Sequence, residues 1–132
     1  MGVYGALYNW YAVADSRLIA PAGWHGPTDA EWTTLTDYLG GEEIAGSELK
    51  EWGVSHWASP NTYAKITGVF FALPGGDRSY LTGLFDDLHY SGSWWSKTVF
   101  DTDRAWYRGL HYLNGNVNRN ISDRGTASQS DA

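Results

Sequence analysis

The chain has 132 residues, 42% hydrophobic and 16% aromatic, enough to bury one core, so residues 1–132 are predicted to form a single domain. The formal net charge of -6 and nine dispersed Lys and Arg residues argue against a nucleic-acid partner, because phosphate backbones would be repelled. The lack of cysteine excludes disulfides and thiolate chemistry, and no apolar run approaches the roughly 20 residues that span a bilayer, so no direct membrane insertion is expected.

The first part of the chain predicts irregular segments around helices. Residues 4–14 are aromatic and apolar, which favours an extended segment or an irregular packing unit. Proline and glycine then break regular structure between residues 21 and 27. Residues 45–52 have a composition compatible with a short helix of one or two turns.

The clearest element is a helix that begins after Thr28. Thr28 and Glu31 have the spacing of a capping box, in which each side chain accepts a hydrogen bond from the other residue's backbone. Gly40-Gly41 marks the end of the helix. The apolar residues in between recur at helical spacing and predict its buried face: Trp32, Leu35 and Leu39.

From residue 53 onward the composition changes to Gly, Ser, Asn and aromatic residues, which predicts strands and loops. Short apolar runs at 69–73 and at Trp94-Trp95 lie between turn signals. Helices followed by antiparallel strands indicate an α+β fold rather than alternating βαβ units.

The last predicted element is a hairpin. Asn114-Gly115 favours a two-residue turn with positive φ, which would join a strand at 105–113 to one at 116–121. Residues 122–132 are polar and lack strand alternation, so this tail is expected to be frayed or rerouted.

A strand over residues 105–113 would have two unlike faces, because successive side chains alternate. One face is predicted to be core and carries Trp106, Leu110 and Tyr112. The other carries aromatic and imidazole groups that a solvated strand rarely needs, so it is a candidate for function: Tyr107, Gly109, His111 and Leu113.

The aromatic residues divide into two groups. Indole buries a large apolar area, so most tryptophans are assigned to the core: Trp10, Trp24, Trp32, Trp94, Trp95 and Trp106. Other aromatic residues lie among Gly, Ser and Asp in apparent loops or on the outward strand face, a composition typical of binding loops: Tyr80, Phe85, Tyr90, Phe100 and Tyr107.

Local signatures of catalysis are missing. Neither Gly-x-Ser-x-Gly nor His-Glu-x-x-His occurs, so the chain is not expected to be an enzyme. No cofactor is expected to be required; calcium is the metal that loop carboxylates such as Asp101 and Asp103 would suit. The histidines lack paired metal spacing and are interpreted as packing or surface residues: His25, His56, His89 and His111.

Several ordered motifs run through the chain. They are Leu7-Tyr8-Asn9-Trp10-Tyr11-Ala12-Val13, Ala20-Pro21-Ala22-Gly23-Trp24-His25, Pro27-Thr28-Asp29-Ala30-Glu31-Trp32, Leu73-Pro74-Gly75-Gly76, Trp94-Trp95-Ser96 and Ala105-Trp106-Tyr107-Arg108. Together they resemble the Fibrobacter succinogenes major paralogous domain family over roughly residues 4–121.

The resemblance implies a C-type-lectin-like fold of the formylglycine-generating-enzyme type, with two helices packed on a small twisted antiparallel sheet with long loops. It also implies an extracellular, cell-surface or viral-particle setting. The related sulfatase-activating enzymes depend on active-site cysteines, which this chain lacks. Members usually end in a strand resembling Gly-Phe-Ser-Val-Arg-Cys, and the different sequence here leaves that strand open: Gly125-Thr126-Ala127-Ser128-Gln129-Ser130.

Domains of this fold also serve as variable proteins of diversity-generating retroelements, in which adenine-directed mutagenesis rewrites chosen codons. All Glu residues fall at or before Glu51, and between Gly76 and Gln129 the only Lys, Glu, Gln or Met is Lys97. That stretch is rich in residues reachable when the adenines of an Asn codon are randomised. The alternative is ordinary drift within a loop-rich paralogous family.

These observations predict a recognition domain for a protein or glycan ligand, with protein slightly favoured. Its loops 77–93 and 97–104 and the outward residues of strand 105–113 would form one patch. The alternative is a structural or partner-docking module of a larger bacterial envelope protein. The predicted ligand-binding residues are Tyr80, Phe85, Asp86, Asp87, His89, Tyr90, Ser91, Phe100, Asp101, Asp103, Tyr107, Gly109, His111 and Leu113.

Overall fold

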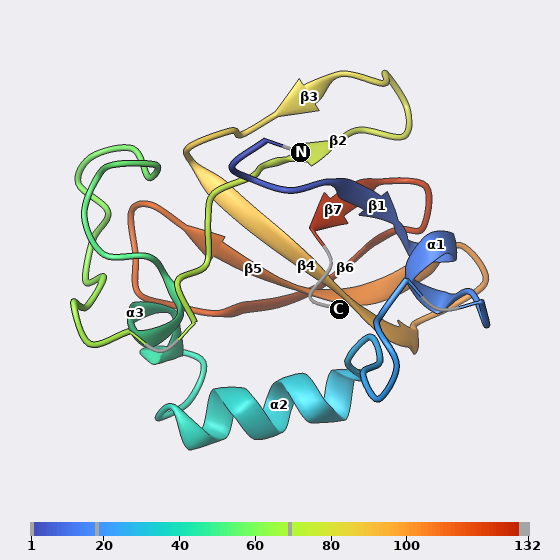
Figure 1. Ribbon diagram of the computed structural model, residues 1–132, viewed down its shortest axis with the longest axis horizontal. Coiled ribbons are helices and arrows are strands. Elements are labelled where there is room, and N and C mark those ends of the chain that lie inside the picture. The colour runs from blue at the N-terminus through green and yellow to red at the C-terminus, as the bar shows by residue number, and fades with distance from the viewer. Residues whose placement is uncertain (1, 18, 69, 130–132) are drawn as a thin grey trace.

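The computed structural model describes residues 2–17, 19–68 and 70–129 (Figure 1). These residues confirm the predicted α+β class, and none of their helices is long and apolar enough to cross a bilayer. The elements in chain order are β1 (Leu7–Asn9), α1 (Trp10–Ala14), α2 (Asp29–Tyr38), α3 (Ala45–Leu49), β2 (Asp77–Arg78), β3 (Phe85–Asp86), β4 (Ser91–Val99), β5 (Arg104–His111), β6 (Asn118–Asp123) and β7 (Ala127–Gln129).

The strands form a sheet in the order β3-β2-β7-β4-β5-β6, with β1 paired to β7 outside this path. All these pairings are antiparallel except that of β4 with β7, which is parallel at Trp94 and Gln129. In the long central ladders, Trp94 lies opposite Arg108, and Arg108 lies opposite Arg119. Figure 1 shows α2 along one side of these strands and the β2–β3 hairpin beyond their opposite side.

The helix α2 forms as the sequence predicts. The Thr28 hydroxyl accepts a hydrogen bond from the Glu31 N–H at 3.1 Å, and the Glu31 carboxylate accepts one from the Thr28 N–H at 2.8 Å. Asp29 and Glu31 place negative charge in the first turn, where the helix dipole favours it. Gly40 and Gly41 then have positive φ, which lets the chain leave the helix sharply.

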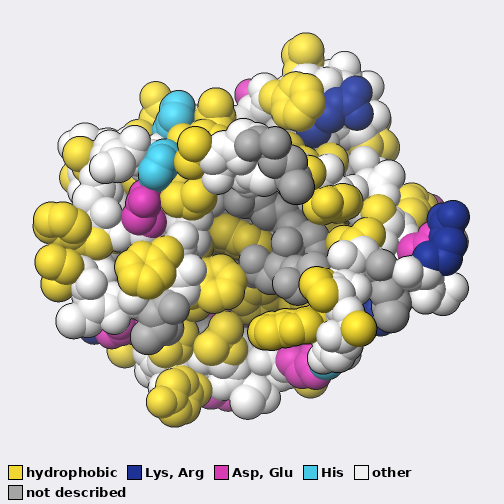
Figure 2. Space-filling model, viewed as in Figure 1, with side chains coloured by type: hydrophobic (Ala, Val, Ile, Leu, Met, Phe, Trp, Pro, Cys, Tyr) yellow, Lys and Arg dark blue, Asp and Glu magenta, His cyan; other side chains and the backbone are white. Residues whose placement is uncertain are grey.

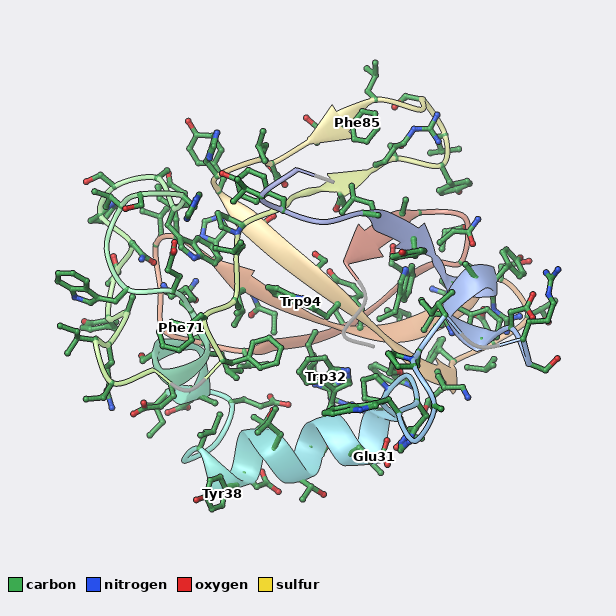
Figure 3. All side chains as sticks on the ribbon, viewed as in Figure 1. Glu31, Trp32, Tyr38, Phe71, Phe85 and Trp94 are labelled. Atoms are coloured by element: carbon green, nitrogen blue, oxygen red, sulfur yellow. The ribbon has the colours of Figure 1, made fainter. Side chains whose placement is uncertain are left out.

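Two apolar cores lie on opposite faces of the sheet, because the neighbours Trp94 and Trp95 in β4 point in opposite directions. Figure 3 shows Trp32 and Trp94 in the space between α2 and the sheet. The larger core contains Trp32, Ala45, Leu49, Trp57, Ala72, Trp94, Leu110 and Val117. The smaller core contains Val13, Trp95 and Ala105, with Tyr8, Trp10 and Tyr107 packed against it.

Indole hydrogen bonds tie the N-terminal elements to β4. The Trp32 Nε1–H donates to the Trp95 carbonyl at 3.2 Å, which joins α2 to the strand. The Trp95 Nε1–H donates to the Tyr8 carbonyl at 3.1 Å, and the Trp10 Nε1–H donates to the Ser96 carbonyl at 3.1 Å. These bonds satisfy indole N–H donors that burial would otherwise leave without an acceptor. They also hold α2, β1 and α1 to β4.

The prediction that six tryptophans lie in the core is only partly right. Trp24 is 67% exposed and lies in a surface turn, where its backbone N–H donates to the Pro21 carbonyl at 3.0 Å. Trp10 and Trp106 are half-buried. The other three are buried as predicted: Trp32, Trp94 and Trp95.

Arg108 is buried at the centre of the sheet and anchors α2 through Asp29. Its guanidinium donates to the Asp29 carboxylate at 2.7 Å and to the Thr33 hydroxyl at 3.1 Å. Arg119 of β6 donates to the same carboxylate at 2.7 Å and stacks on Trp106, with Cζ 3.7 Å from the ring centre. Burial opposes ionisation of Asp29, but the hydrogen bonds from Arg119 and Arg108 outweigh it and lower its pKa.

Lys50 follows α3 and is fully buried, with no carboxylate partner among the described residues. Its Nζ donates to the carbonyls of Thr62 at 2.8 Å, His111 at 3.1 Å and Asn114 at 2.8 Å. It also lies 5.5 Å from the centre of the Trp57 ring. Burial lowers the pKa of Lys50 to about 8. One side chain therefore joins α3 to an irregular segment and to the end of β5.

The connection between β5 and β6 differs from the prediction. A two-residue turn at Asn114-Gly115 needs positive φ, which neither residue has, and strand pairing already ends at Gly109 and Asn118. A Cβ at position 115 would overlap the Ser47 hydroxyl of α3. Gly115 is therefore required for close packing of a longer loop on α3, a contact that the local pattern does not report.

The C-terminal segment also differs from the prediction. Residues 122–129 are not frayed: they complete β6 and form β7, which pairs with β1, β2 and β4. Ser128 is 3% exposed in this position. Residues 130–132 of the predicted tail lie outside the described residues. Strand formation here comes from pairing on both sides, which outweighs the weak local alternation.

Two further boundaries are corrected. The opening segment contains a regular helix, α1, in addition to the extended β1. The predicted helix at 45–52 ends at Leu49, because Lys50 turns away to form a bridge with Ala72. Of the apolar run at 69–73, Val69 lies outside the described residues.

Replacing Asp29 with asparagine is expected to lower the free energy of unfolding by about 3 kcal/mol at neutral pH, because buried Arg108 loses its counter-charge. The folded-state pKa of Asp29 lies below its unfolded value of about 3.9, so this stability is present above that pH and is lost as the pH falls through the folded pKa. The difference between wild type and Asp29→Asn should therefore shrink in acid. Urea denaturation measures both effects, with Asp15→Asn, which breaks an exposed pair with Arg17, as the control. Equal losses in the two variants would contradict the anchoring role.

Lys50→Met is expected to lower the free energy of unfolding by about 2–4 kcal/mol, because three buried carbonyl oxygens lose their donor at once. Thermal and urea unfolding measure the loss. Lys65→Met is the control, since Lys65 is largely exposed and pairs with Glu48 at the surface. A Lys50 variant as stable as the control would show that relieved desolvation of the ammonium outweighs the lost bonds.

Candidate functional site

The β2–β3 hairpin and the segment after it, residues 77–90, are here called the arm. The arm projects from the edge of the sheet (Figure 1), and Figure 2 shows hydrophobic side chains beside a basic one at this edge. Exposed apolar patches of this kind mark interaction sites, because water disfavours them on an idle surface. Six large apolar residues of the arm are between 45% and 77% exposed: Tyr80, Leu81, Leu84, Phe85, Leu88 and Tyr90.

Hydrogen bonds between residues 78 and 84 stabilise the shape of the arm. The Arg78 Nε–H donates to the Gly83 carbonyl at 3.0 Å, and the guanidinium lies 5.7 Å from the centre of the Phe85 ring. The Ser79 N–H donates to the Leu84 carbonyl at 3.0 Å, and the Gly83 N–H donates to the Ser79 carbonyl at 2.9 Å. The arm is therefore ordered without a ligand while its apolar side chains stay in solvent, so binding would cost little ordering entropy.

Three carboxylates lie at the root of the arm. Asp77 is paired with Asp86 across the β2–β3 register, and Asp87 follows. Burial, and then the charges of Asp87 and Asp86, raise the pKa of Asp77. Burial and the nearby charge of Asp77 also raise the pKa of Tyr107 on β5. None of the three carboxylates forms an ion pair with a described residue.

A second group of predicted site residues gathers where β4 begins and β5 ends. Ser91 lies opposite His111, and the Tyr112 N–H donates to the Tyr90 carbonyl at 3.0 Å. The register therefore brings residues 89–91 next to residues 111–113. Ser91 and His111 are partly buried, and the more exposed members of the group are His89, Tyr90 and Leu113.

The predicted patch of loops 77–93 and 97–104 is interrupted between residues 89–91 and the second loop. Phe100, Asp101 and Asp103 follow the end of β4, while residues 89–91 lie at its start. The strand spans nine residues, at about 3.3 Å each, so its length separates the two loops. Tyr80 of the arm lies elsewhere, against the β6–β7 turn. A Cβ added at Gly125 in that turn would touch the Tyr80 side chain.

Asp101 is not available as a calcium ligand. Its Oδ1 accepts from the Asp103 N–H at 3.0 Å and the Arg104 N–H at 2.8 Å, and its Oδ2 accepts from the Arg104 guanidinium at 2.8 Å. The hydrogen bond from Arg104 is the main cause of its lowered pKa. Among the described residues no cluster of three His, Cys, Asp or Glu could hold a metal. The residues therefore do not fit a calcium site, and Asp101 instead shapes the turn.

The face of β5 predicted to be open to solvent is partly covered. Tyr107 packs against the smaller core, with its ring 6.2 Å from that of Trp95, and Gly109 is buried. Arg108 and Leu110 are buried on the opposite face. The predicted alternation is therefore right, but Tyr107 is covered by N-terminal residues of the smaller core, and Gly109 is buried in the sheet.

Over residues 1–130 the chain matches the Fibrobacter succinogenes major domain. It belongs to this family. Comparison with curated proteins and with solved structures gives no match.

The motifs that carry the resemblance to the Fibrobacter succinogenes major domain meet each other in the scaffold. Asp29 of one motif pairs with Arg108 of another. Trp95 of a third donates to Tyr8 of a fourth. The six apolar residues of the arm lie outside all these motifs. The family motifs and the apolar residues of the arm are therefore different parts of this domain.

Sequence analysis missed the three leucines of the arm. Their spacing of i, i+3 and i+7 is that of one helix face, but Gly83 and the polar residues around it indicated a loop, so the spacing was not used. The available signal was the presence of several large apolar residues within one predicted loop. These residues are Leu81, Leu84 and Leu88.

Sequence analysis also missed a polar cluster built from distant segments. His56 Nδ1 lies 2.8 Å from the Glu51 carboxylate. His89 Nδ1 donates to the His56 carbonyl at 2.8 Å, and the Tyr4 hydroxyl lies 3.1 Å from the same nitrogen. Figure 2 shows two adjacent histidine side chains with a carboxylate beside them on the visible face. These contacts attach the N-terminal segment to the base of the arm.

Asp77→Asn is expected to raise the free energy of unfolding at neutral pH by roughly 0.5 kcal/mol, the scale of partly screened charge interactions. A carboxyl whose pKa is raised on folding destabilises the fold when ionised, so its stability term falls as the pH rises from about 4 through the folded pKa. The gain should vanish well below pH 4. Urea unfolding at several pH values measures it, and Asp103→Asn, at an exposed position, is the control. A loss of stability in Asp77→Asn at neutral pH would contradict the repulsion at the root.

Proposed function

We propose that this domain is a recognition module that binds a protein ligand through the arm. One observation carries the proposal: hydrogen bonds of Arg78, Ser79 and Gly83 within the arm fix its shape, and six large apolar side chains are left in solvent. Aromatic anchors that become buried on binding supply much of the affinity in protein interfaces, and apolar neighbours exclude water around them. His89 and Tyr90, with the neighbouring ends of β4 and β5, extend this surface.

The division between scaffold and surface supports the same function. Family motifs supply the Asp29–Arg108 pair and the Trp95–Tyr8 hydrogen bond of the scaffold, and the exposed arm lies outside these motifs. We infer a C-type-lectin-like fold of the formylglycine-generating-enzyme type, in which helices cover one face of a twisted sheet and long segments form the binding surface. We also infer a variable protein of a diversity-generating retroelement, displayed on a cell surface or viral particle. The composition of residues 77–128 supports this inference, because glutamate is confined to earlier residues.

No enzymatic role is proposed. Two carboxylate–histidine contacts occur among the described residues, Glu31 with His25 and Glu51 with His56, and the second is the more buried. Nucleophilic catalysis would need a nucleophile oriented by such a pair, and the polar contacts of this cluster instead join the N-terminal segment to the arm.

The double variant Leu81→Ser/Phe85→Ser is expected to weaken ligand binding by at least 30-fold, because two central anchors are lost while the fold is kept. The ligand is first isolated by pull-down from a surface proteome, and its affinity is then measured by calorimetry. Tyr38→Ser/Ile66→Ser is the matched control, since both positions are also largely exposed but lie away from the arm. Loss of binding in the control, with full binding in the arm variant, would refute the proposal. A spacer or docking module would show no ligand whose binding depends on the arm.

A further inference from the structure

We propose that the partner of the arm presents a basic, apolar protein surface, in which lysine or arginine side chains meet the carboxylates at the root while apolar side chains cover the tip. The inference rests on the proposed function, since it assigns the chemistry of the ligand for the same surface. It commits to a positively charged protein segment as the occupant.

Charge at the root of the arm is left uncompensated by the fold. Asp77, Asp86 and Asp87 form no ion pair with a described residue. The nearest cation in sequence is Arg78, which is used by the Gly83 carbonyl and the Phe85 ring. The domain therefore offers a negative site beside an apolar one, and a complementary partner carries cations at the matching place.

The cations of neighbouring elements are also engaged elsewhere. Arg124, in the turn that touches Tyr80, stacks over Trp10 at 4.4 Å from the ring centre and donates to the Asp101 carbonyl. Arg104 binds the Asp101 carboxylate. Rearrangement of these side chains toward the root would break contacts that hold the β4–β5 turn.

Mutual repulsion of the root carboxylates makes an external cation favourable. The charges of Asp86 and Asp87 add to burial in disfavouring ionisation of Asp77. A lysine or arginine brought by a partner would relieve that repulsion on binding, and apolar contact would exclude water from the pair. The root thus favours cationic partners over neutral ones.

Charge also argues against a second copy of this chain as the occupant. The whole domain carries a formal charge of -6. Any pairing of two arms that placed the two sets of root carboxylates together would oppose six acidic groups, and the cation of each arm, Arg78, is already engaged within that arm. Such like-charge juxtaposition in an interface costs several kcal/mol, so self-association through the arm is disfavoured.

The test uses two synthetic peptides of equal length, one alternating leucine with lysine and the other alternating leucine with glutamate. Calorimetric titration of the whole chain is expected to show binding of the leucine–lysine peptide, at least tenfold tighter than the leucine–glutamate peptide and weaker at higher salt. Equal affinity for both peptides, or no binding of either, would overturn the inference.

Charge variants separate the root from the overall charge of the domain. Asp77→Asn/Asp86→Asn/Asp87→Asn is expected to weaken binding of the leucine–lysine peptide at least tenfold. Thermal unfolding checks that each variant is folded. If the root variant and the control variant lose affinity for the peptide equally, the effect of charge is non-specific and the inference is overturned. The control removes three exposed charges away from the arm: Asp37→Asn/Glu42→Gln/Glu43→Gln.

Apolar variants separate failure of the inference from failure of the proposed function. If the Leu81→Ser/Phe85→Ser variant and the root variant each lose peptide binding, the inference and the proposed function are both supported. If the apolar variant loses binding but the root variant does not, the arm remains the contact surface and the basic partner is refuted. If the apolar variant binds normally, the proposed function fails. Sedimentation that shows a dimer dissolved by the same apolar variant would assign the arm to a second copy and overturn the inference.

Discussion

A buried ion pair between Asp29 and Arg108 is the contact on which the arrangement of this domain depends. Arg108 lies in the middle of the sheet, where an unpaired guanidinium would be very costly, so the N-terminal turn of α2 must sit directly over β5. With the helix held there, Trp32 covers Trp94 and donates to the Trp95 carbonyl, which closes the larger core. Arg119 binds the same carboxylate and extends the anchor to β6.

The arm contributes little to the packing of the scaffold. The cores are closed by the central strands, α2 and the N-terminal segment, so the hairpin β2–β3 contributes no buried apolar residue to either core. Its shape comes from its own hydrogen bonds and from the pairing of β2 with β7. Side chains on such an element can change with little effect on stability. That freedom is what a recognition surface requires, and it is consistent with a family whose motifs lie in the scaffold.

The exposed loop residues of the candidate site could be proposed from composition, but their grouping could not. Tyr80, Phe85 and Tyr90 were predicted from aromatic residues set among Gly, Ser and Asp, and all three are exposed. Whether loops meet depends on strand direction and length, and β4 separates residues 89–91 from the loop at 97–104 that the sequence suggested was their neighbour. Tyr107 shows the other limit: alternation assigns its face correctly, while cover by the N-terminal segment decides its exposure.

Interactions within a few residues were determined by the sequence itself. The capping box of Thr28 and Glu31, the helix it starts, the strand alternation around Arg108 and the α+β order of elements all follow from local hydrogen bonding and side-chain period. Tertiary structure alone decided the burial of Lys50 under three carbonyls, the packing of Gly115 on α3 and the formation of β7 from a polar tail. Each of these joins segments distant along the chain, and the free energy that favours them comes from partners that no local window contains.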